Sequence, residues 1–146
     1  MNDLSYLAGF FDGEACIRGA MQASGALVVS INISLKDSRP LYKFKQYFEV
    51  GTIALYPQEP PYKYYTFTAY SKNAGIILST LLPLLIVKKE EALLALEAVE
   101  LSRHDLINHL PRLAQIFHEL KEVKRRAPEE IENSKNLKGM QLATLP

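Results

Sequence analysis

The spacing of hydrophobic and polar residues changes along the chain and predicts a helix followed by a hairpin. Apolar residues recur at helical spacing from Leu4 to Phe11, and this helix is expected to end near Gly13. Two stretches of strand-like alternation follow at 15–24 and 26–36, the second rich in β-branched residues. Small turn-forming residues lie between them, so we expect an antiparallel hairpin.

A second helix and a second hairpin are predicted downstream. Asp37 or Ser38 is expected to cap a helix that has Pro40 in its first turn. Alternating segments at 50–56 and 62–70 then predict another antiparallel hairpin. Three further helices are predicted at 72–82, capped by Ser71, at 87–101, beyond a break at Pro83, and at 106–126.

This order of elements predicts an α+β fold with an αββαββα core, an antiparallel sheet and additional C-terminal helices. At 146 residues the chain is long enough for one domain with its own core. We expect that domain to span residues 1–126, followed at 127–146 by a tail or a packed extension. The nonapeptide at 7–15 occurs only once in the sequence.

Composition indicates what class of protein this is and which cellular compartment it fits. The hydrophobic fraction of 48% and charged fraction of 23% are those of a globular protein. The single cysteine, Cys16, excludes an intrachain disulfide and fits a reducing compartment. No secretory signal is recognisable, and the longest apolar block, at 76–87, is too short and too interrupted to span a bilayer. We therefore expect an intracellular protein with no membrane partner.

Charge and histidine content alone assign no ligand. The 17 basic and 16 acidic residues leave a net charge of +1, so any nucleic-acid surface must come from where the charges lie. His104, His109 and His118 lack metal-ligand spacing with Cys16, which argues against a zinc site.

Two glycines give the first predicted helix a flat face. A glycine inside a helix costs about 1 kcal/mol relative to alanine, so close approach of another helix to Gly9 and Gly13 would offset that cost. Because the segment occurs once, the second helix would come from a second subunit, and we assign Ala8, Gly9 and Asp12 to this homodimer contact. The simpler alternative is a helix that ends on a glycine and carries a surface glutamate.

Glu14, which follows Gly13, would give this subunit contact a chemical role. Two subunits would bring two Glu14 carboxylates together near a two-fold axis, where like charges repel unless divalent cations lie between them. Oxygen ligands of this kind suit Mg²⁺.

The sequence Leu-Ala-Gly-Phe-Phe-Asp-Gly-Glu-Ala at 7–15 resembles the LAGLIDADG motif of homing endonucleases. It matches at Leu7, Ala8, Gly9 and Asp12, and carries an acidic residue at the eighth position. The order of elements over residues 4–101 is similar to the core of that family. The resemblance implies a homodimeric, site-specific endonuclease that makes a double-strand break at a long pseudo-palindromic DNA site.

The resemblance also implies roles for individual residues. Glu14 would bind the metal, with the Gly13 carbonyl as a further contact and Mg²⁺ or another divalent cation as cofactor. The segment 82–89 resembles a proline-containing stretch that ends in a catalytic-site lysine, which places Lys88 near the scissile phosphate. Arg39 resembles another residue of that pocket.

The sequence departs from the family pattern at two positions. Ala15 replaces the usual final glycine of the motif. Leu35 lies where the family often has a polar residue near the attacking water, so Ser34 or Lys36 takes that role or the role is not used.

Polar residues at alternate strand positions predict a face that reads DNA. Arginine, glutamine and asparagine side chains pair with base edges in the major groove, which a β-ribbon can enter. In the second hairpin, Thr52, Ala54 and Tyr56 share a face either with Lys63 or with Thr66 and Thr68. Singly, each polar strand residue is more simply solvent-exposed. The predicted DNA contacts are Arg18, Gln22, Ser30, Asn32, Ser34, Lys36, Tyr56, Lys63, Thr66 and Thr68.

Other functions on the same scaffold stay open at this point. An intron RNA maturase would share the motif and would bind RNA. A regulator that binds DNA without cutting it would be expected to lose the acid at position 14, which this chain retains.

Overall fold

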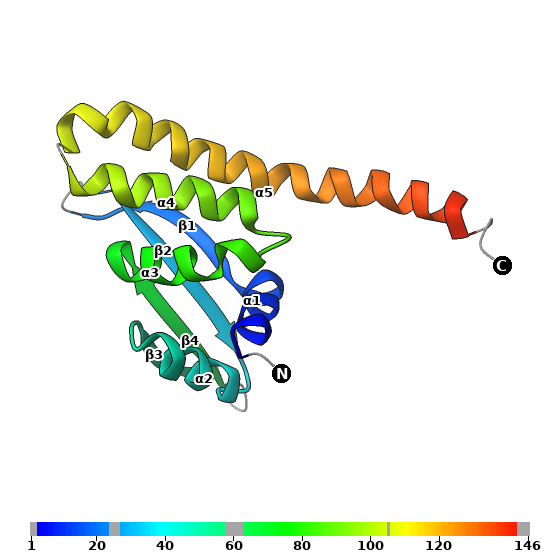
Figure 1. Ribbon diagram of the computed structural model, residues 1–146, viewed down its shortest axis with the longest axis horizontal. Helices are drawn as coiled ribbons and strands as arrows, with labels where there is room; N and C mark the ends of the chain where they lie inside the picture. The colour runs from blue at the N-terminus through cyan, green and yellow to red at the C-terminus, as the bar shows by residue number, and fades with distance from the viewer. Residues whose placement is uncertain (1–2, 24–26, 58–62, 105, 143–146) are drawn as a thin grey trace.

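The computed structural model describes residues 3–23, 27–57, 63–104 and 106–142, with side chains as far as Arg125 (Figure 1). It confirms the expected α+β fold and αββαββα order. The elements are α1 (Asp3–Glu14), β1 (Cys16–Met21), β2 (Leu27–Leu35), α2 (Arg39–Phe48), β3 (Thr52–Pro57), β4 (Lys63–Tyr70), α3 (Ser71–Leu81), the 3-10 helix η1 (Leu82–Leu84), α4 (Lys89–Arg103) and α5 (Leu106–Leu142).

The four strands form one antiparallel sheet in the order β1-β2-β4-β3, so the two hairpins meet along β2 and β4. Asn32 lies opposite Cys16 on one side and Thr68 on the other, and Thr68 lies opposite Thr52. Since successive side chains point to opposite faces of a strand, these four residues form one row across one face of the sheet.

The other face of the sheet is buried under the helices. Figure 1 shows α3 and α4 crossing the sheet, with α1 and α2 beside them. Phe44 of α2 lies at the centre of this core, with ring centroids 6.1 Å from Phe11, 4.8 Å from Phe48 and 5.2 Å from Phe67. The fully buried apolar side chains at this interface include Leu7, Ile17, Ile31, Ile33, Leu41, Ile77 and Leu78.

The structure agrees with one predicted helix start and differs from another. At α2, Ser38 occupies the N-cap without a side-chain bond, and Asp37 Oδ1 instead accepts the Arg39 N–H at 3.0 Å. At α3, Ser71 is the first helical residue and Tyr70 occupies the N-cap, so the prediction of Ser71 as the cap is wrong. Ser71 has φ 48° because the chain passes from β4 into α3 with no linker and must turn sharply there.

The last helix is longer than its hydrophobic pattern suggested. α5 begins at Leu106 as predicted and continues past residue 126 to Leu142. The division into a domain at 1–126 and an extension at 127–146 stays a prediction. Among the described residues, no helix combines the length and the apolar character needed to cross a bilayer.

Candidate functional site

Asp12 joins the C-terminal end of α1 to the segment that precedes α4. Its Oδ2 accepts the Ile86 N–H at 2.7 Å, and its Oδ1 accepts the Lys88 N–H at 3.0 Å. In return, the Lys88 ammonium donates to the Asp12 carbonyl oxygen at 2.6 Å. The Lys88 ammonium therefore contacts Asp12, which precedes Glu14 by two residues. Lys88 and Asp12 are 76 positions apart in the sequence.

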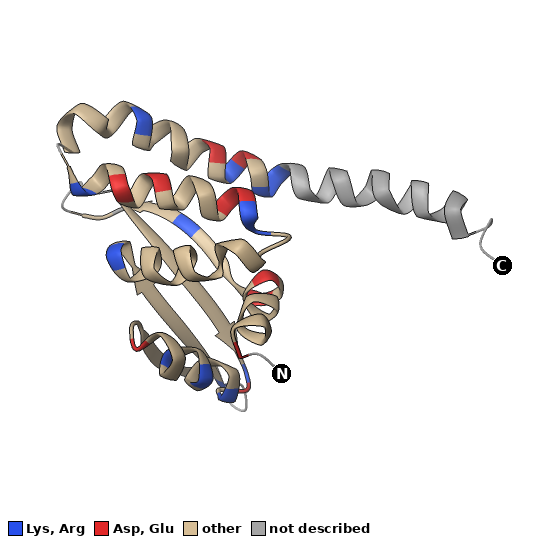
Figure 2. Cartoon of the chain, in the orientation of Figure 1, with Lys and Arg blue, Asp and Glu red and all other residues tan. Residues whose placement is uncertain are grey.

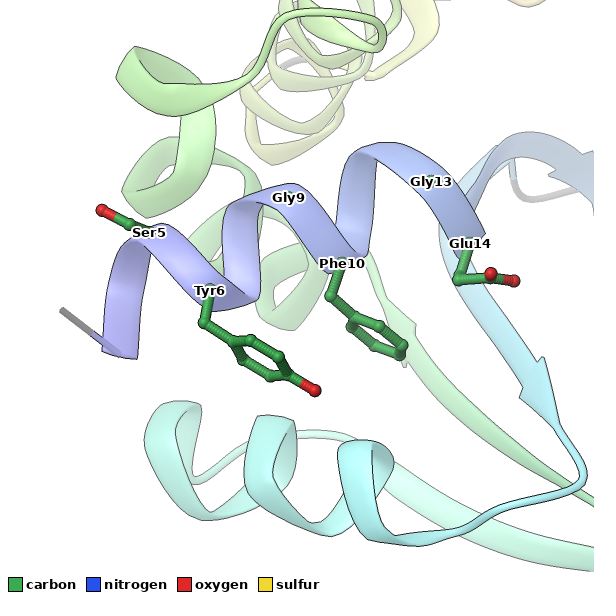
Figure 3. A pocket seen from close by; sticks show the side chains of 6 residues that line it. All are labelled: Ser5, Tyr6, Gly9, Phe10, Gly13 and Glu14. Atoms are coloured by element: carbon green, nitrogen blue, oxygen red, sulfur yellow. The ribbon is translucent and has the colours of Figure 1, made fainter. Parts of the chain in front are cut away.

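Glu14 is the last residue of α1, and its exposed side chain points away from the helix (Figure 3). The Gly13 carbonyl lies in the last turn of α1, beyond the final helical bond that the Ala15 N–H donates to the Phe11 carbonyl at 3.0 Å. A carboxylate and a backbone carbonyl are the hard oxygen ligands that Mg²⁺ takes, usually together with water. The donor set at this end of α1 therefore fits a magnesium ion.

One chain supplies few acidic ligands at this position. Within the described ranges, no group of three or more His, Cys, Asp and Glu side chains is arranged to hold a metal ion. A metal bound at Glu14 would therefore depend on backbone oxygens, water, substrate oxygens or another chain for its remaining ligands.

The Arg39 side chain forms an ion pair with Asp37. Its guanidinium forms a two-pronged contact with Asp37, with Nε–Oδ1 at 3.0 Å and Nη2–Oδ2 at 2.5 Å. The side-chain and backbone hydrogen bonds from Arg39 lower the pKa of the Asp37 carboxyl to about 2. In the described part of the chain, no hydrogen bond or ion pair joins Arg39 to Glu14 or Lys88. Arg39 nevertheless follows the end of β2, the end of the sheet at which β1 leaves α1.

The uncovered face of the sheet carries an ordered polar network across β2 and β4. The Ser34 and Thr66 hydroxyls lie 2.9 Å apart, and the Thr68 hydroxyl donates to Asn32 Oδ1 at 3.4 Å. Asn32 Nδ2 in turn donates to Ser30 Oγ at 3.2 Å. Ser30 is only 6% exposed, so it holds Asn32 rather than offering a free surface group.

The register resolves the alternative for the second hairpin. Thr52 pairs with Thr68 and Ala54 with Thr66, so β3 places Thr52, Ala54 and Tyr56 on the face of the two threonines. Lys63 pairs with Pro57 and lies on the opposite parity, so the sheet does not bring it together with Thr66 and Thr68.

The remaining predicted contacts lie at the margins of the polar face. Arg18 is exposed and lies opposite Ser30, while Gln22 follows β1 and Lys36 follows β2, at opposite ends of the hairpin. Leu35 packs against the core, so Ser34 and Lys36 are the polar side chains at this end of β2.

Some surface residues were missed by the sequence interpretation. Tyr70 lies opposite Ser30 and is 55% exposed on the polar face, and Tyr64 stacks on Tyr56 with ring centroids 5.5 Å apart. Strand parity would have found both, counted back from Thr66 to Tyr64 and forward from Thr66 to Tyr70. Figure 2 shows no acidic residue on the drawn strands, with most acids on α1, α4 and α5. The four strands as described therefore add no negative charge to the polar face that would repel phosphate.

α1 also presents an exposed hollow between its own side chains (Figure 3). A Cβ built on Gly9 or Gly13 would meet no atom within 4 Å, so this strip of the helix is open. Tyr6 and Phe10 point from α1 toward α2, and the ring centroids of Phe10 and Phe44 lie 6.3 Å apart. The residues lining the hollow are Ser5, Tyr6, Gly9, Phe10, Gly13 and Glu14.

The assignment of Ala8 to the subunit contact needs correction. Ala8 is 1% exposed and belongs to the core of its own chain, so it is not available to a partner helix. Both carboxylate oxygens of Asp12 accept bonds from residues 86 and 88 of the same chain, and its place at a subunit contact stays a prediction. Of the three residues assigned to that contact, Gly9 alone lines the hollow.

The fold and this end of α1 define a known class of protein. The family model of LAGLIDADG endonucleases matches residues 7–99 of the 146-residue chain. The protein belongs to the LAGLIDADG endonuclease family, as the motif at 7–15 predicted. Membership makes it a relative of DNA-cutting hydrolases. No curated protein matches its sequence.

Solved structures of homing endonucleases share the fold. I-CvuI in complex with its target in the presence of Ca has a TM-score of 0.71 at 18% identity, with 82% of this chain and 80% of that chain covered. I-CvuI with the I-CreI target and Mg, in which the DNA is not cleaved, has a TM-score of 0.69 at 19% identity, with 82% and 80% covered. The archaeal intron-encoded I-Vdi141I complexed with DNA has a TM-score of 0.71 at 22% identity, with 82% of each chain covered.

Proposed function

We propose that this protein is a site-specific homing endonuclease that makes a double-strand break by divalent-metal-dependent hydrolysis. The observation that carries the proposal is the placement of Lys88 beside the Gly13–Glu14 end of α1, through its hydrogen bond to the Asp12 carbonyl. A cation and a metal-binding carboxylate in one place suit chemistry on a phosphodiester. Family membership and DNA-bound structures with the same fold support this proposal.

Different residues of the chain would have different roles in the hydrolysis. Glu14 and the Gly13 carbonyl would hold Mg²⁺, and the ion supplies a more acidic water and stabilises charge on the phosphate. Lys88 adds positive charge at the scissile phosphate, where charge develops during hydrolysis. Arg39, 88% exposed at the same end of the sheet, contributes a second cation to this pocket. Ser34 at the end of β2 and Lys36 directly after it flank Leu35, and one of them positions the attacking water if that role is used.

A homodimer would complete the site. Each chain supplies one Glu14, and two strands of DNA need two cuts. The open strip at Gly9 and Gly13 is where a second α1 can approach. Asp12 follows Gly9 by three residues, so the segment it holds flanks this strip. In that segment, Ile86 is 85% and Val87 72% exposed, and a second subunit would cover these apolar side chains. A two-fold protein then predicts a pseudo-palindromic target.

The polar face of the sheet would bind the DNA on either side of the cut. Arg18 and Asn32 present groups that pair with guanine and adenine edges in the major groove. The hydrogen bonds of Asn32 with Ser30 and Thr68 fix the direction of its amide before DNA binds. Gln22, Tyr56, Thr66 and exposed lysines extend this surface.

Selection from a duplex DNA library with Mg²⁺ tests the proposed function. We expect wild-type protein to cut a long pseudo-palindromic site on both strands. Glu14→Gln should bind the selected site but lose cutting by at least about a hundredfold, because the amide is a poor metal ligand. The control is Glu97→Gln, which removes a carboxylate that pairs with Arg112 on α5.

Three outcomes would contradict the proposal. Equal cutting by Glu14→Gln would remove Glu14 from the metal site. Binding of DNA without cutting by the wild type would favour a regulator. Binding of structured intron RNA in preference to all duplexes would favour a maturase.

A further inference from the structure

We infer that Asp12 is a positioning residue for Lys88, fixing the lysine at the end of α1 next to Glu14. This inference rests on the proposed function for its catalytic consequence. The geometry behind it belongs to the free protein and can be tested without DNA.

The contact exchanges charge between two helix ends. Asp12 lies in the last turn of α1, where the helix dipole disfavours a carboxylate, but it faces the start of α4, where the dipole favours one. Lys88 lies at the start of α4, where a cation is disfavoured, but its ammonium reaches the C-terminal end of α1. Each side chain is therefore stabilised by the helix end that the other residue occupies.

Asp12 also holds the chain where it enters α4. Lys88 occupies the N-cap of α4 and makes no side-chain cap bond, so the first turn of the helix has no capping group of its own. The Asp12 carboxylate accepts the N–H groups of Ile86 and Lys88 from outside the helix. The Lys88 N–H is one of the N–H groups at the start of the helix that have no partner inside it, so α1 satisfies this group and fixes the segment that leads into α4.

Within one chain, little packing holds the segment before α4 in place. Ile86 is 85% exposed and Val87 is 72% exposed, so packing against the core does not fix them. Leu85 is buried and anchors the segment on the side of η1. Between Leu85 and α4, the bonds to Asp12 therefore determine where Lys88 lies. A lysine side chain has four rotatable bonds, and the Asp12 carbonyl selects one orientation of its ammonium.

Amine labelling of the free protein tests the position of Lys88. N-hydroxysuccinimide acetate would label Lys88 and the exposed Lys89, and mass spectrometry would give the ratio of the two rates. We expect Asp12→Asn to raise the Lys88 to Lys89 ratio several-fold, because an amide cannot accept both N–H groups and the segment is released. Glu97→Gln should leave the ratio unchanged. An unchanged ratio in Asp12→Asn would overturn the inference.

A double-mutant cycle on cleavage tests the consequence for catalysis. Asp12→Asn should lower the single-turnover cutting rate by about a hundredfold, as misplacement of a catalytic group by about 1 Å does. DNA affinity without metal should change less than threefold. When Lys88 is already replaced by Met, adding Asp12→Asn should lower the single-turnover cutting rate by less than a further threefold. Equal losses in both backgrounds would show that Asp12 does not act through Lys88.

Circular dichroism would confirm that each variant is folded. If Asp12→Asn does not fold, Asp12→Glu takes its place in both experiments, since it keeps two acceptor oxygens but displaces them. We then expect a smaller rise in Lys88 labelling and a partial loss of cutting. If wild-type protein cuts no DNA, the proposed function fails, while the labelling ratio still decides whether Asp12 positions Lys88.

Discussion

Gly19 on β1 and Phe117 on α5 lie so close that a Cβ on Gly19 would be 2.3 Å from Phe117 Cδ1 and 2.5 Å from Cγ. The ring sits where any other residue would place its side chain. Since β1 is an edge strand, this contact fixes how the C-terminal helix covers the edge of the sheet.

Gly19→Ala should destabilise the protein by about 1–3 kcal/mol, because the methyl group forces the Phe117 ring or the helix to move. Urea denaturation measures the loss. Combining Gly19→Ala with Phe117→Ala should cost less than the sum of the two single changes, since the smaller side chain vacates the space. Strict additivity of the two changes would contradict this account.

Gly9→Gln should separate folding from dimerisation. Because nothing lies within 4 Å of a Cβ at Gly9, the monomer can accept a side chain there without a clash. The melting temperature at low protein concentration should not fall, since replacing a helical glycine removes a cost of about 1 kcal/mol. The proposed helix pair would be blocked, so the mass in solution should drop to that of one chain.

Light scattering measures this mass directly. Asn73→Gln, an exposed change on α3, is the control and should leave the mass unaltered. A Gly9→Gln protein that stays dimeric would mean that the subunits meet elsewhere.

Glu91→Gln should change how stability depends on pH. Glu91 is 7% exposed at the start of α4, and burial raises the pKa of its carboxyl above the usual 4.5, a shift that Lys124 and Lys88 oppose and Glu90 reinforces. A carboxyl with a raised pKa binds its proton more tightly in the folded state, so its contribution is greatest below about pH 4.5 and is lost as the pH rises through the folded value.

The variant, which cannot ionise, should therefore gain stability relative to the wild type between pH 4 and pH 8. Urea midpoints at these two values measure the change. Glu97→Gln should show no such gain, because Glu97 is exposed and pairs with Arg112. A relative stability of Glu91→Gln that falls with rising pH would contradict the role of burial.

Asn32→Ala should alter which base is preferred at one position in each half-site. Its amide is oriented by Ser30 and Thr68, and a bidentate amide contact is worth about 1–3 kcal/mol of discrimination. Sequencing of selected sites measures the change. Asn73→Ala, an amide in the helical layer, should leave the selected sequence unaltered. If both variants select the wild-type site, the polar face does not read bases through Asn32.

Local pattern was sufficient for much of the fold. The order of helices and hairpins could be predicted because hydrophobic spacing and turn residues act over a few neighbouring positions. The acid at position 14 and the strand parity of Arg18, Asn32 and Ser34 come from the same local information. Some boundaries were less accurate: Ser71 looked like a cap, yet the direct passage from β4 into α3 made it a helical residue with φ 48°.

The tertiary structure alone decided which residues of α1 are free and what holds Lys88. Ala8 and Gly9 are neighbours in sequence, but one is buried in the core and the other lines an open strip. Asp12 and Lys88 are 76 residues apart, and no local pattern specifies their contact. The one local sign was a carboxylate in the last turn of a helix, which needs donors from elsewhere. The sequence by itself determined the elements and their polar and apolar faces, because these depend on near neighbours. The joining of α1 to the start of α4 depends on how the folded helices pack, and only the tertiary structure could decide it.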